Sequence, residues 1–306
     1  MLPADDFNPP VGTCVELEPG IRRIVAPNPS PMTYRGTNTY LVGTTDLAVI
    51  DPGPDDPRHL RALQDALLPG QTVSHILVTH AHLDHSPLAR TLAQVTGAKI
   101  LAYGPATSGR SAVMQSLVDS GFTGGGEGID TAFQPDDVVT DGERIDGTGW
   151  TLDVIHTPGH LGNHICLGLG DACFTADHVM GWASSLVSPP DGDLTDFMAS
   201  CARLAAHPWR VFYPGHGDRI EAPAARLAWL VSHRKGREAA ILQALRSGPS
   251  TAANLAQSVY VDTPEALLPA ATRNVLAHLI DLTGQGVVTA PAPLGADSLF
   301  SRVQDD

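Results

Sequence analysis

The sequence predicts an α/β protein with a helical C-terminal region. The first 220 residues alternate short apolar runs typical of strands with amphipathic stretches typical of helices. Beyond that point the pattern becomes helical, and the clusters of potential metal ligands described below no longer occur. A chain of 306 residues lies at the upper limit of what one hydrophobic core supports. We therefore predict a larger domain over residues 1–221 and a smaller domain over residues 222–306.

Apolar periodicity predicts the elements of the first domain in chain order. Strands are expected at 40–42, 47–50, 76–79, 99–102, 138–139, 150–155, 164–168, 172–175 and 211–213. Helices are expected at 57–68, 88–96, 112–118 and 194–206. Gly97 would end the second of these helices, and Asp193 or Thr195 would cap the last. The segment 103–135 is rich in Gly and Ser, including the run Gly124-Gly125-Gly126, and we interpret it as an insertion or lid.

The C-terminal region reads as three helices followed by a short strand. A first helix is expected over 223–245, interrupted by Gly236. Ser250-Thr251 would cap a second helix. Thr263 and Pro264 would open a third helix that runs to about residue 282. Residues 287–289 would form a wing strand, so this region resembles a winged-helix module.

The most informative motif is a cluster of potential metal ligands, His80-Ala81-His82-Leu83-Asp84-His85, directly after the apolar run 76–78. Three imidazoles and a carboxylate in one turn repel one another when charged and lack hydrogen-bond partners when buried. A metal ion removes both costs, because neutral imidazole and carboxylate are good ligands for zinc and similar divalent ions.

Three further candidate ligands follow other predicted strands. His160 comes after the strand at 150–155, Asp177 after 172–175, and His216 after 211–213. A lone loop histidine is usually structural. Four strands that end in this way predict instead that the side chains converge on one edge of the sheet.

These motifs resemble those of the metallo-β-lactamase superfamily. The resemblance covers nearly all of residues 20–220 and rests on segments 36–42, 49–53, 79–85, 157–160, 175–177 and 213–217. It implies an αββα sandwich, with the winged helix as a small C-terminal domain, and a dinuclear metal site. By motif position, His80, His82 and His160 would bind one ion. Asp84, His85 and His216 would bind the other, and Asp177 would bridge them.

Two adjacent cations would deprotonate a water held between them, so the resemblance implies a hydrolase that uses a metal-bridging hydroxide. Asp84 and Asp177 would orient this nucleophile, and Asp84 would also move its proton. His164 and His178 are each a candidate for substrate contact or general acid, or for a loop hydrogen bond alone, and we favour the loop hydrogen bond for His164. Asp51 is either an acceptor for a ligand histidine or a turn residue.

The two-domain arrangement resembles the β-lactamase-like protein 2 branch, in which some members cleave single-stranded RNA. Three hypotheses follow. One is a phosphodiesterase or RNA endonuclease in which Arg234, Lys235 and Arg237 touch phosphates, although a basic cluster on a helix is usually a solvated face. A second is hydrolysis of a small thioester, lactone or other acyl compound, as in glyoxalase II-type relatives. A third, disfavoured by the seven candidate ligands, is a nonenzymatic metal-dependent regulator.

The charge and composition of the chain indicate which kinds of binding partner and cofactor to expect. The net charge of −14 is concentrated in residues 1–220, which hold 12 Lys and Arg against 25 Asp and Glu. This acidity disfavours tight binding to nucleic acid, and no double-stranded DNA partner is expected. No apolar run is long enough to cross a membrane, the start of the chain is unlike a signal peptide, and the four cysteines follow no disulfide or zinc spacing. We expect a cytoplasmic enzyme with two divalent ions, zinc first and iron or manganese as alternatives.

Overall fold

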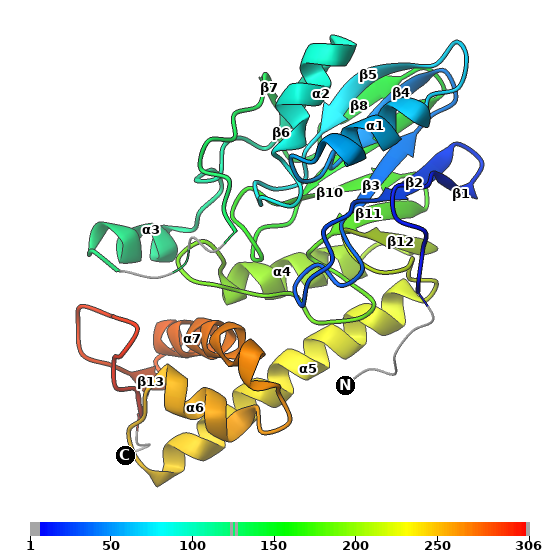
Figure 1. Ribbon diagram of the computed structural model, residues 1–306. Coiled ribbons are helices and arrows are strands. Elements are labelled where there is room, and N and C mark those ends of the chain that lie inside the picture. The colour runs from blue at the N-terminus through cyan, green and yellow to red at the C-terminus, as the bar shows by residue number, and fades with distance from the viewer. Residues whose placement is uncertain (1–6, 123–124, 126–127, 304–306) are drawn as a thin grey trace.

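The computed structural model describes residues 7–122, 125 and 128–303. Two β-sheets pack face to face, and helices cover the outer face of each sheet (Figure 1). This arrangement confirms the predicted αββα sandwich. Residues 1–6 at the start of the chain, and Gly124 and Gly126 of the glycine-rich run, lie outside the described residues.

The first sheet has seven strands in sequence order, and the second has five strands in the order β12-β11-β10-β9-β8. The first contains β1 (Val15–Glu18), β2 (Ile21–Val25), β3 (Asn38–Val42), β4 (Asp46–Ile50), β5 (Thr72–Leu77), β6 (Lys99–Ala102) and β7 (Asp137–Val138). The second contains β8 (Arg144–Gly147), β9 (Trp150–His156), β10 (Ile165–Leu169), β11 (Ala172–Ala176) and β12 (Val211–Pro214). The pairs β4–β5, β5–β6, β6–β7 and β11–β12 are parallel.

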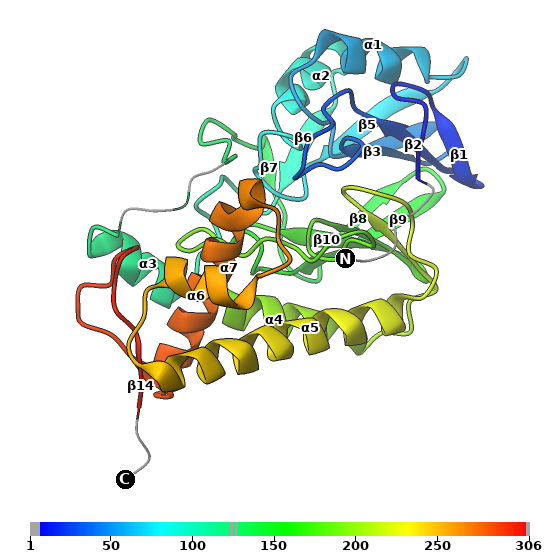
Figure 2. The same ribbon diagram turned by 60° about the horizontal axis from the view of Figure 1, so that its bottom comes forward.

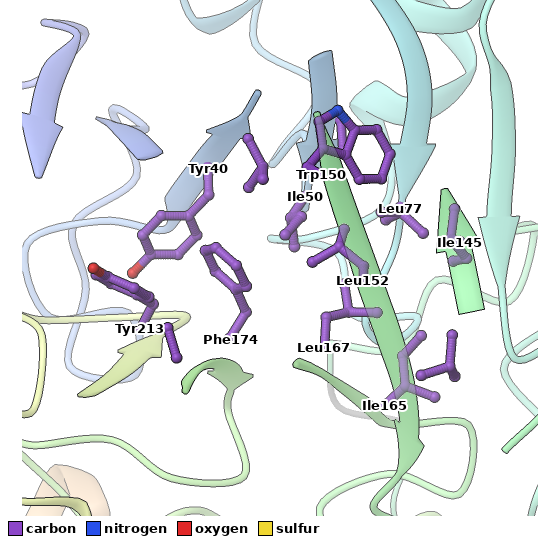
Figure 3. Packing of buried hydrophobic residues seen from close by; sticks show 14 of the residues in the cluster. Tyr40, Ile50, Leu77, Ile145, Trp150, Leu152, Ile165, Leu167, Phe174 and Tyr213 are labelled. Atoms are coloured by element: carbon purple, nitrogen blue, oxygen red, sulfur yellow. The ribbon is translucent and has the colours of Figure 1, made fainter. Parts of the chain in front are cut away.

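Strand alternation divides the apolar side chains between two layers. In β11, Phe174 faces the opposite sheet, while Cys173 faces the helices below. In β4, Ile50 faces the opposite sheet and Val49 faces the helices above. Figure 3 shows the core between the sheets, where Tyr40, Phe174 and Tyr213 meet at one end. Both faces of each sheet are therefore buried, which is why these strands read as continuous apolar runs.

The helices of the sandwich pack as two pairs. The first sheet is covered by α1 (Pro57–Asp65) and α2 (Leu88–Thr96), and the second by α4 (Leu194–Ala205) and part of α5 (Pro223–Ala244). The Asp193 side chain caps α4 by accepting from the backbone N–H of Thr195 and of Asp196, and Gly97 ends α2 with φ 77°. Both sequence predictions are confirmed.

The C-terminal region packs around one core that also includes α3 (Ala112–Asp119) of the predicted insertion. This core joins Met114 and Leu117 of α3 to the far end of α5, α6 (Ala252–Val259) and α7 (Leu268–Gly284). Short elements complete the region: η1 (Leu245–Ser247), η2 (Glu265–Leu267), and the wing strands β13 (Val288–Thr289) and β14 (Ser301–Arg302). Figure 2 shows α7 crossing above α5 with α6 beside it. No helix in the described part of the chain could span a membrane.

Several element boundaries differ from prediction for physical reasons. The helix α5 continues through Gly236, where an added Cβ atom would meet nothing within 4 Å, so this glycine does not mark a break or a close approach. The helix α7 begins at Leu268 rather than at Thr263, since Pro264 is extended and Pro269 takes the first turn instead. The strand expected at 76–79 is β5, which starts earlier and ends at Leu77. The strands β1, β2 and β8 were not predicted, because their charged residues break the apolar pattern.

Candidate metal centre

The topology brings the ends of four strands to one edge of the sandwich. The turn that carries residues 80–85 follows β5, and the loops that carry His160, Asp177 and His216 follow β9, β11 and β12. The strands β11 and β12 are parallel, and their register pairs Ala176 with Pro214. Asp177 and His216 therefore leave the sheet at the same level.

All seven sequence-predicted residues lie together in two groups. One group contains His80, His82, His160 and Asp177, and the other contains Asp84, His85, Asp177 and His216. Within each group the candidate ligand atoms lie within 4.8 Å of one another. Asp177 belongs to both groups, so its carboxylate is the geometric link between them.

The distances show how closely the side chains converge. Asp84 Oδ2 lies 3.1 Å from His216 Nε2, and Asp177 Oδ2 lies 3.3 Å from the same nitrogen. His160 Nε2 lies 3.1 Å from His82 Nδ1. Gly215 allows this approach, since a Cβ at that position would collide with Asp177 Oδ1.

The residues present fit a pair of divalent cations. His80 Nε2, His85 Nε2 and Asp177 Oδ1 are buried and have no hydrogen-bond partner. Buried polar atoms without partners are rare, and several that point into one space indicate that they coordinate a common group. A set of five imidazoles and two carboxylates suits zinc, iron or manganese.

The second ring nitrogen of four of these histidines is engaged by a neighbouring oxygen. His85 Nδ1 lies 2.9 Å from Asp51 Oδ2, and His160 Nδ1 lies 2.7 Å from the carbonyl oxygen of Leu186. The other two contacts join His80 Nδ1 to Thr79 Oγ1 at 3.0 Å and His216 Nδ1 to Gly36 O at 3.2 Å. Such contacts fix the ring orientation and leave the other nitrogen facing the centre.

Asp51 accepts a hydrogen bond from the candidate ligand His85, which is one of the two roles that the sequence suggested for it. Its side chain is buried and also accepts from the backbone N–H and the hydroxyl of Thr79. Its backbone φ of 51° is unusual for a residue other than glycine. Sequence reasoning missed Thr37, whose hydroxyl donates to Asp84 Oδ2 at 3.2 Å. The motif 36–42 that carried the family resemblance was the signal for it.

Burial and mutual charge shift the pKa values of the cluster in opposite directions. Burial, reinforced by His160, lowers the pKa of His82 to about 3. Burial disfavours the charged form of Asp177 as well, yet His216 and His85 hold its pKa well below the usual range. Burial also acts against the charged form of His216, but Asp177 and Asp84 raise its pKa to about 10. A cation at the second group would therefore displace a proton from His216.

His178, the sequence candidate for general acid, lies away from the centre. Its side chain is buried, its Nε2 lies 3.5 Å from Cys201 Sγ, and its ring packs on Phe197. Burial lowers the pKa of His178 to about 3. The side chain of His178 does not line the cleft at the centre, so this geometry does not favour a contact with substrate. His164 is also buried, with its Nδ1 2.9 Å from Thr157 Oγ1, as the loop interpretation expected.

A cleft of about 400 Å³ opens on the centre. His82, Asp84, His160, Asp177 and His216 form its floor. Its walls are mostly apolar and come from both halves of the chain: Met32, Ile129, Met180, Trp182 and Leu186 on one side and Tyr260, Leu267, Ala270 and Ala271 on the other. Among the described residues, no lysine or arginine lines it.

The three basic residues proposed to touch phosphates do not face this cleft. Arg234 is buried and donates to Ser185 O and Asn274 Oδ1. Arg237 donates to Val259 O and lies over the ring of Tyr260. Only Lys235 is exposed. Arg234 is therefore enclosed and cannot reach a phosphate, while the partly buried Arg237 is engaged by Val259 and Tyr260 outside the cleft lining.

Comparison with known proteins agrees with this architecture. Residues 32–216 match the model of the metallo-β-lactamase superfamily. The chain belongs to the metallo-β-lactamase superfamily. Residues 251–292 match the β-lactamase-associated winged helix domain, which confirms the predicted character of the C-terminal region. The protein is thus a superfamily hydrolase with an associated winged helix.

Three relatives illustrate the range of this superfamily. The β-lactamase-like protein 2 homologue of Drosophila melanogaster is 31% identical over 278 residues, which cover 88% of this chain and 90% of the relative. An atrochrysone carboxyl ACP thioesterase of Cryptosporiopsis sp. is 30% identical over 241 residues, 78% of this chain and 66% of that protein. The crystal structure of a metallo-β-lactamase family protein from Thermus thermophilus has a TM-score of 0.75 at 26% identity, with 94% and 100% of the two chains covered.

Proposed function

We propose that this superfamily member is a dinuclear-metal-dependent hydrolase of small acyl compounds, with a thioester or ester of an apolar acyl group as substrate. The observation that carries this proposal is the cleft, which leads to the candidate ligands between apolar walls and without a cationic side chain in its described lining. An apolar acyl group gains free energy from burial against such walls, at roughly 25 cal/mol per Å². The similarity to a thioesterase supports the same substrate class.

The seven residues of the two groups are proposed as ligands, with His80, His82 and His160 on one ion, Asp84, His85 and His216 on the other, and Asp177 shared. When bound, two divalent ions of this kind supply a nucleophile from water near neutral pH and polarise the bond that is cleaved. Zinc is the proposed metal because imidazoles dominate the ligand set.

Asp84 is the proposed proton acceptor. Its side chain is 24% exposed and lines the cleft, whereas that of Asp177 is 10% exposed. Burial alone would raise the pKa of Asp84, but His85 and His216 hold it well below its usual range. The carboxylate is therefore ionised, and its position at the cleft floor makes it the candidate acceptor. The Thr37 hydroxyl orients it from the side.

The apolar walls come from two parts of the chain, and we propose that residues 1–221 form the catalytic domain while residues 222–306 complete the cleft. In this view the winged helix shapes the substrate site through Leu267, Ala270 and Asn274. Single-stranded RNA is a weaker candidate, because its phosphates would face carboxylates and apolar side chains at the centre. No observation on the cleft favours it.

A substrate panel tests this proposal. The zinc-loaded protein is assayed on acyl thioesters of increasing chain length, on p-nitrophenyl esters and lactones, and on bis(p-nitrophenyl) phosphate and single-stranded RNA. We expect kcat/KM to rise with the apolar area of the acyl group. Cleavage of RNA with little turnover of any acyl compound would refute the proposed substrate class.

A further inference from the structure

Two buried arginines of α5 donate to the backbone of the segment 180–187, which follows the shared ligand candidate Asp177. We propose that Arg226 and Arg234, together with Asn274 of α7, are positioning residues that hold Asp177 and His160 in place through this segment. We refer to these three residues as the C-terminal anchor. The inference rests on the proposed dinuclear centre and adds a role for the C-terminal helices within it.

The first part of the anchor consists of direct bonds to carbonyl oxygens. Arg226 Nε donates to Met180 O, and a terminal nitrogen of the same side chain donates to Ala183 O, both at 2.6 Å. Arg234 donates to Ser185 O, which lies further along the same segment. The two arginines are eight residues apart, so both can face the same neighbour from one helix.

The second part leads from this segment to the ligands. The Ser185 hydroxyl lies within hydrogen-bond distance of the backbone carbonyl oxygens of Asp177 and His178, which share its single proton. The carbonyl oxygen of the next residue, Leu186, lies 2.7 Å from His160 Nδ1. One residue of the segment thus contacts the backbone of Asp177, and its neighbour orients the ring of His160.

Asn274 connects the two parts. Its Oδ1 accepts from Arg234 at 2.9 Å and from the backbone N–H of Val187 at 3.0 Å. The arginine and the asparagine therefore hold the segment on either side of Leu186. A shift of Leu186 O would release His160 Nδ1 and let its ring turn away from the centre.

The burial of Arg234 argues that its charge serves orientation rather than packing. The side chain is fully buried, and among the described residues no carboxylate forms an ion pair with it. The buried charge of its guanidinium group is stabilised by two hydrogen bonds and by the face of the Phe197 ring, which lies 5.0 Å from the guanidinium carbon. Burial lowers its pKa. An apolar side chain of similar volume would fill this space at lower cost, so the directed hydrogen bonds explain why an arginine is present.

Direct measurement of zinc affinity tests the anchor without any substrate. The full-length protein is stripped of metal, and Zn²⁺ is titrated in competition with a chromophoric chelator. In Arg234→Met we expect the affinity of the His160-containing site to fall roughly 10- to 100-fold, the range found when partners of metal ligands are removed. Arg237→Met is the matched control, since Arg237 lies on the same helix and also donates to a carbonyl, that of Val259, outside the segment.

Unchanged zinc affinity in a folded Arg234→Met would overturn the anchor. An equal loss in Arg237→Met would also overturn it, because the effect would then be general destabilisation. If Arg234→Met does not fold, Ser185→Ala is the second test, since it removes only the hydroxyl that contacts Asp177 O and His178 O. In this variant we expect about a tenfold loss of zinc affinity. Zinc affinity equal to that of the wild type would refute the inference. A wild-type chain that binds no zinc would instead refute the proposed function, which keeps the two failures distinct.

Discussion

Asp51 Oδ2 lies 2.9 Å from His85 Nδ1, and this contact joins the end of β4 to the turn after β5. The same carboxylate accepts two bonds from Thr79. It therefore fixes both the start of the 80–85 turn and the ring of one of its histidines. A residue outside the candidate ligand set thus determines the geometry of the cluster.

Asp51→Asn should weaken metal binding. Both carboxylate oxygens act as acceptors, so the amide nitrogen of the variant would face a donor wherever it is placed. We expect zinc affinity to fall about 10- to 100-fold while the fold is retained, as measured by chelator competition and circular dichroism. Asp153→Asn on β9 is the control, because the side chain of Asp153 is exposed and its ion pair with Arg144 lies at the surface. Equal affinities in the two variants would contradict this role.

Asp84→Asn should lower kcat without preventing substrate binding. The variant keeps the side-chain shape but cannot accept a proton, so kcat should fall about 100- to 10,000-fold. Steady-state kinetics on the best acyl substrate, with zinc content measured in parallel, give the result. A variant with two bound ions and wild-type kcat would show that Asp84 moves no proton.

Leu267→Asp should raise KM for apolar acyl substrates. Leu267 lines the cleft beyond the candidate ligands, and loss of one leucine contact costs about 1.5–3 kcal/mol. This corresponds to a KM increase of roughly tenfold or more, with kcat little changed. Val261→Asp is the matched control, since Val261 belongs to the same connection but is 74% exposed and outside the cleft lining. If KM is unchanged in Leu267→Asp, the acyl group does not bind against Leu267, which would contradict this prediction.

His59 should make the fold sensitive to mild acid. The side chain is buried, with its Nε2 2.8 Å from Thr39 Oγ1, and burial lowers its pKa from 6.5 to about 4. The unfolded chain binds the proton first, so this contribution is fully present above pH 6.5 and is lost as the pH falls to about 4. The loss amounts to roughly 3 kcal/mol.

Urea denaturation at pH 7.5 and at pH 4.5 measures this loss, and His59→Gln isolates it from the titration of other groups. The free energy of unfolding should fall less with acid in the variant than in the wild type. Parallel decreases in the two proteins would mean that His59 is protonated inside the fold.

Much of this architecture could be predicted from sequence because its signals are local. The strands β3, β4, β6 and β11 read as apolar runs since both faces of each are buried. The seven cluster residues stood at strand ends beside Gly, Pro or Thr, where loops commonly carry ligands. The cap at Asp193 and the end of α2 at Gly97 also follow from neighbouring residues alone.

Long-range contacts account for what the sequence did not reveal. Arg234 reads as part of a solvated basic stretch, and only its packing against the 180–187 segment makes it an internal donor. His178 adjoins Asp177 in sequence, yet its ring points toward Cys201 and away from the cleft. The cleft itself joins residues from both ends of the chain, such as Met32 and Leu267. Contacts between residues so far apart in the chain cannot be predicted from local sequence patterns.

The most direct test of the account is the number of zinc ions bound per folded chain, measured by calorimetric titration of the metal-free protein and by elemental analysis. The two groups that share Asp177 predict two ions per chain in the wild type and the loss of at least one in Asp177→Ala. A folded wild-type chain that binds no ion or a single ion, or an Asp177→Ala variant that still binds two, would contradict the dinuclear centre.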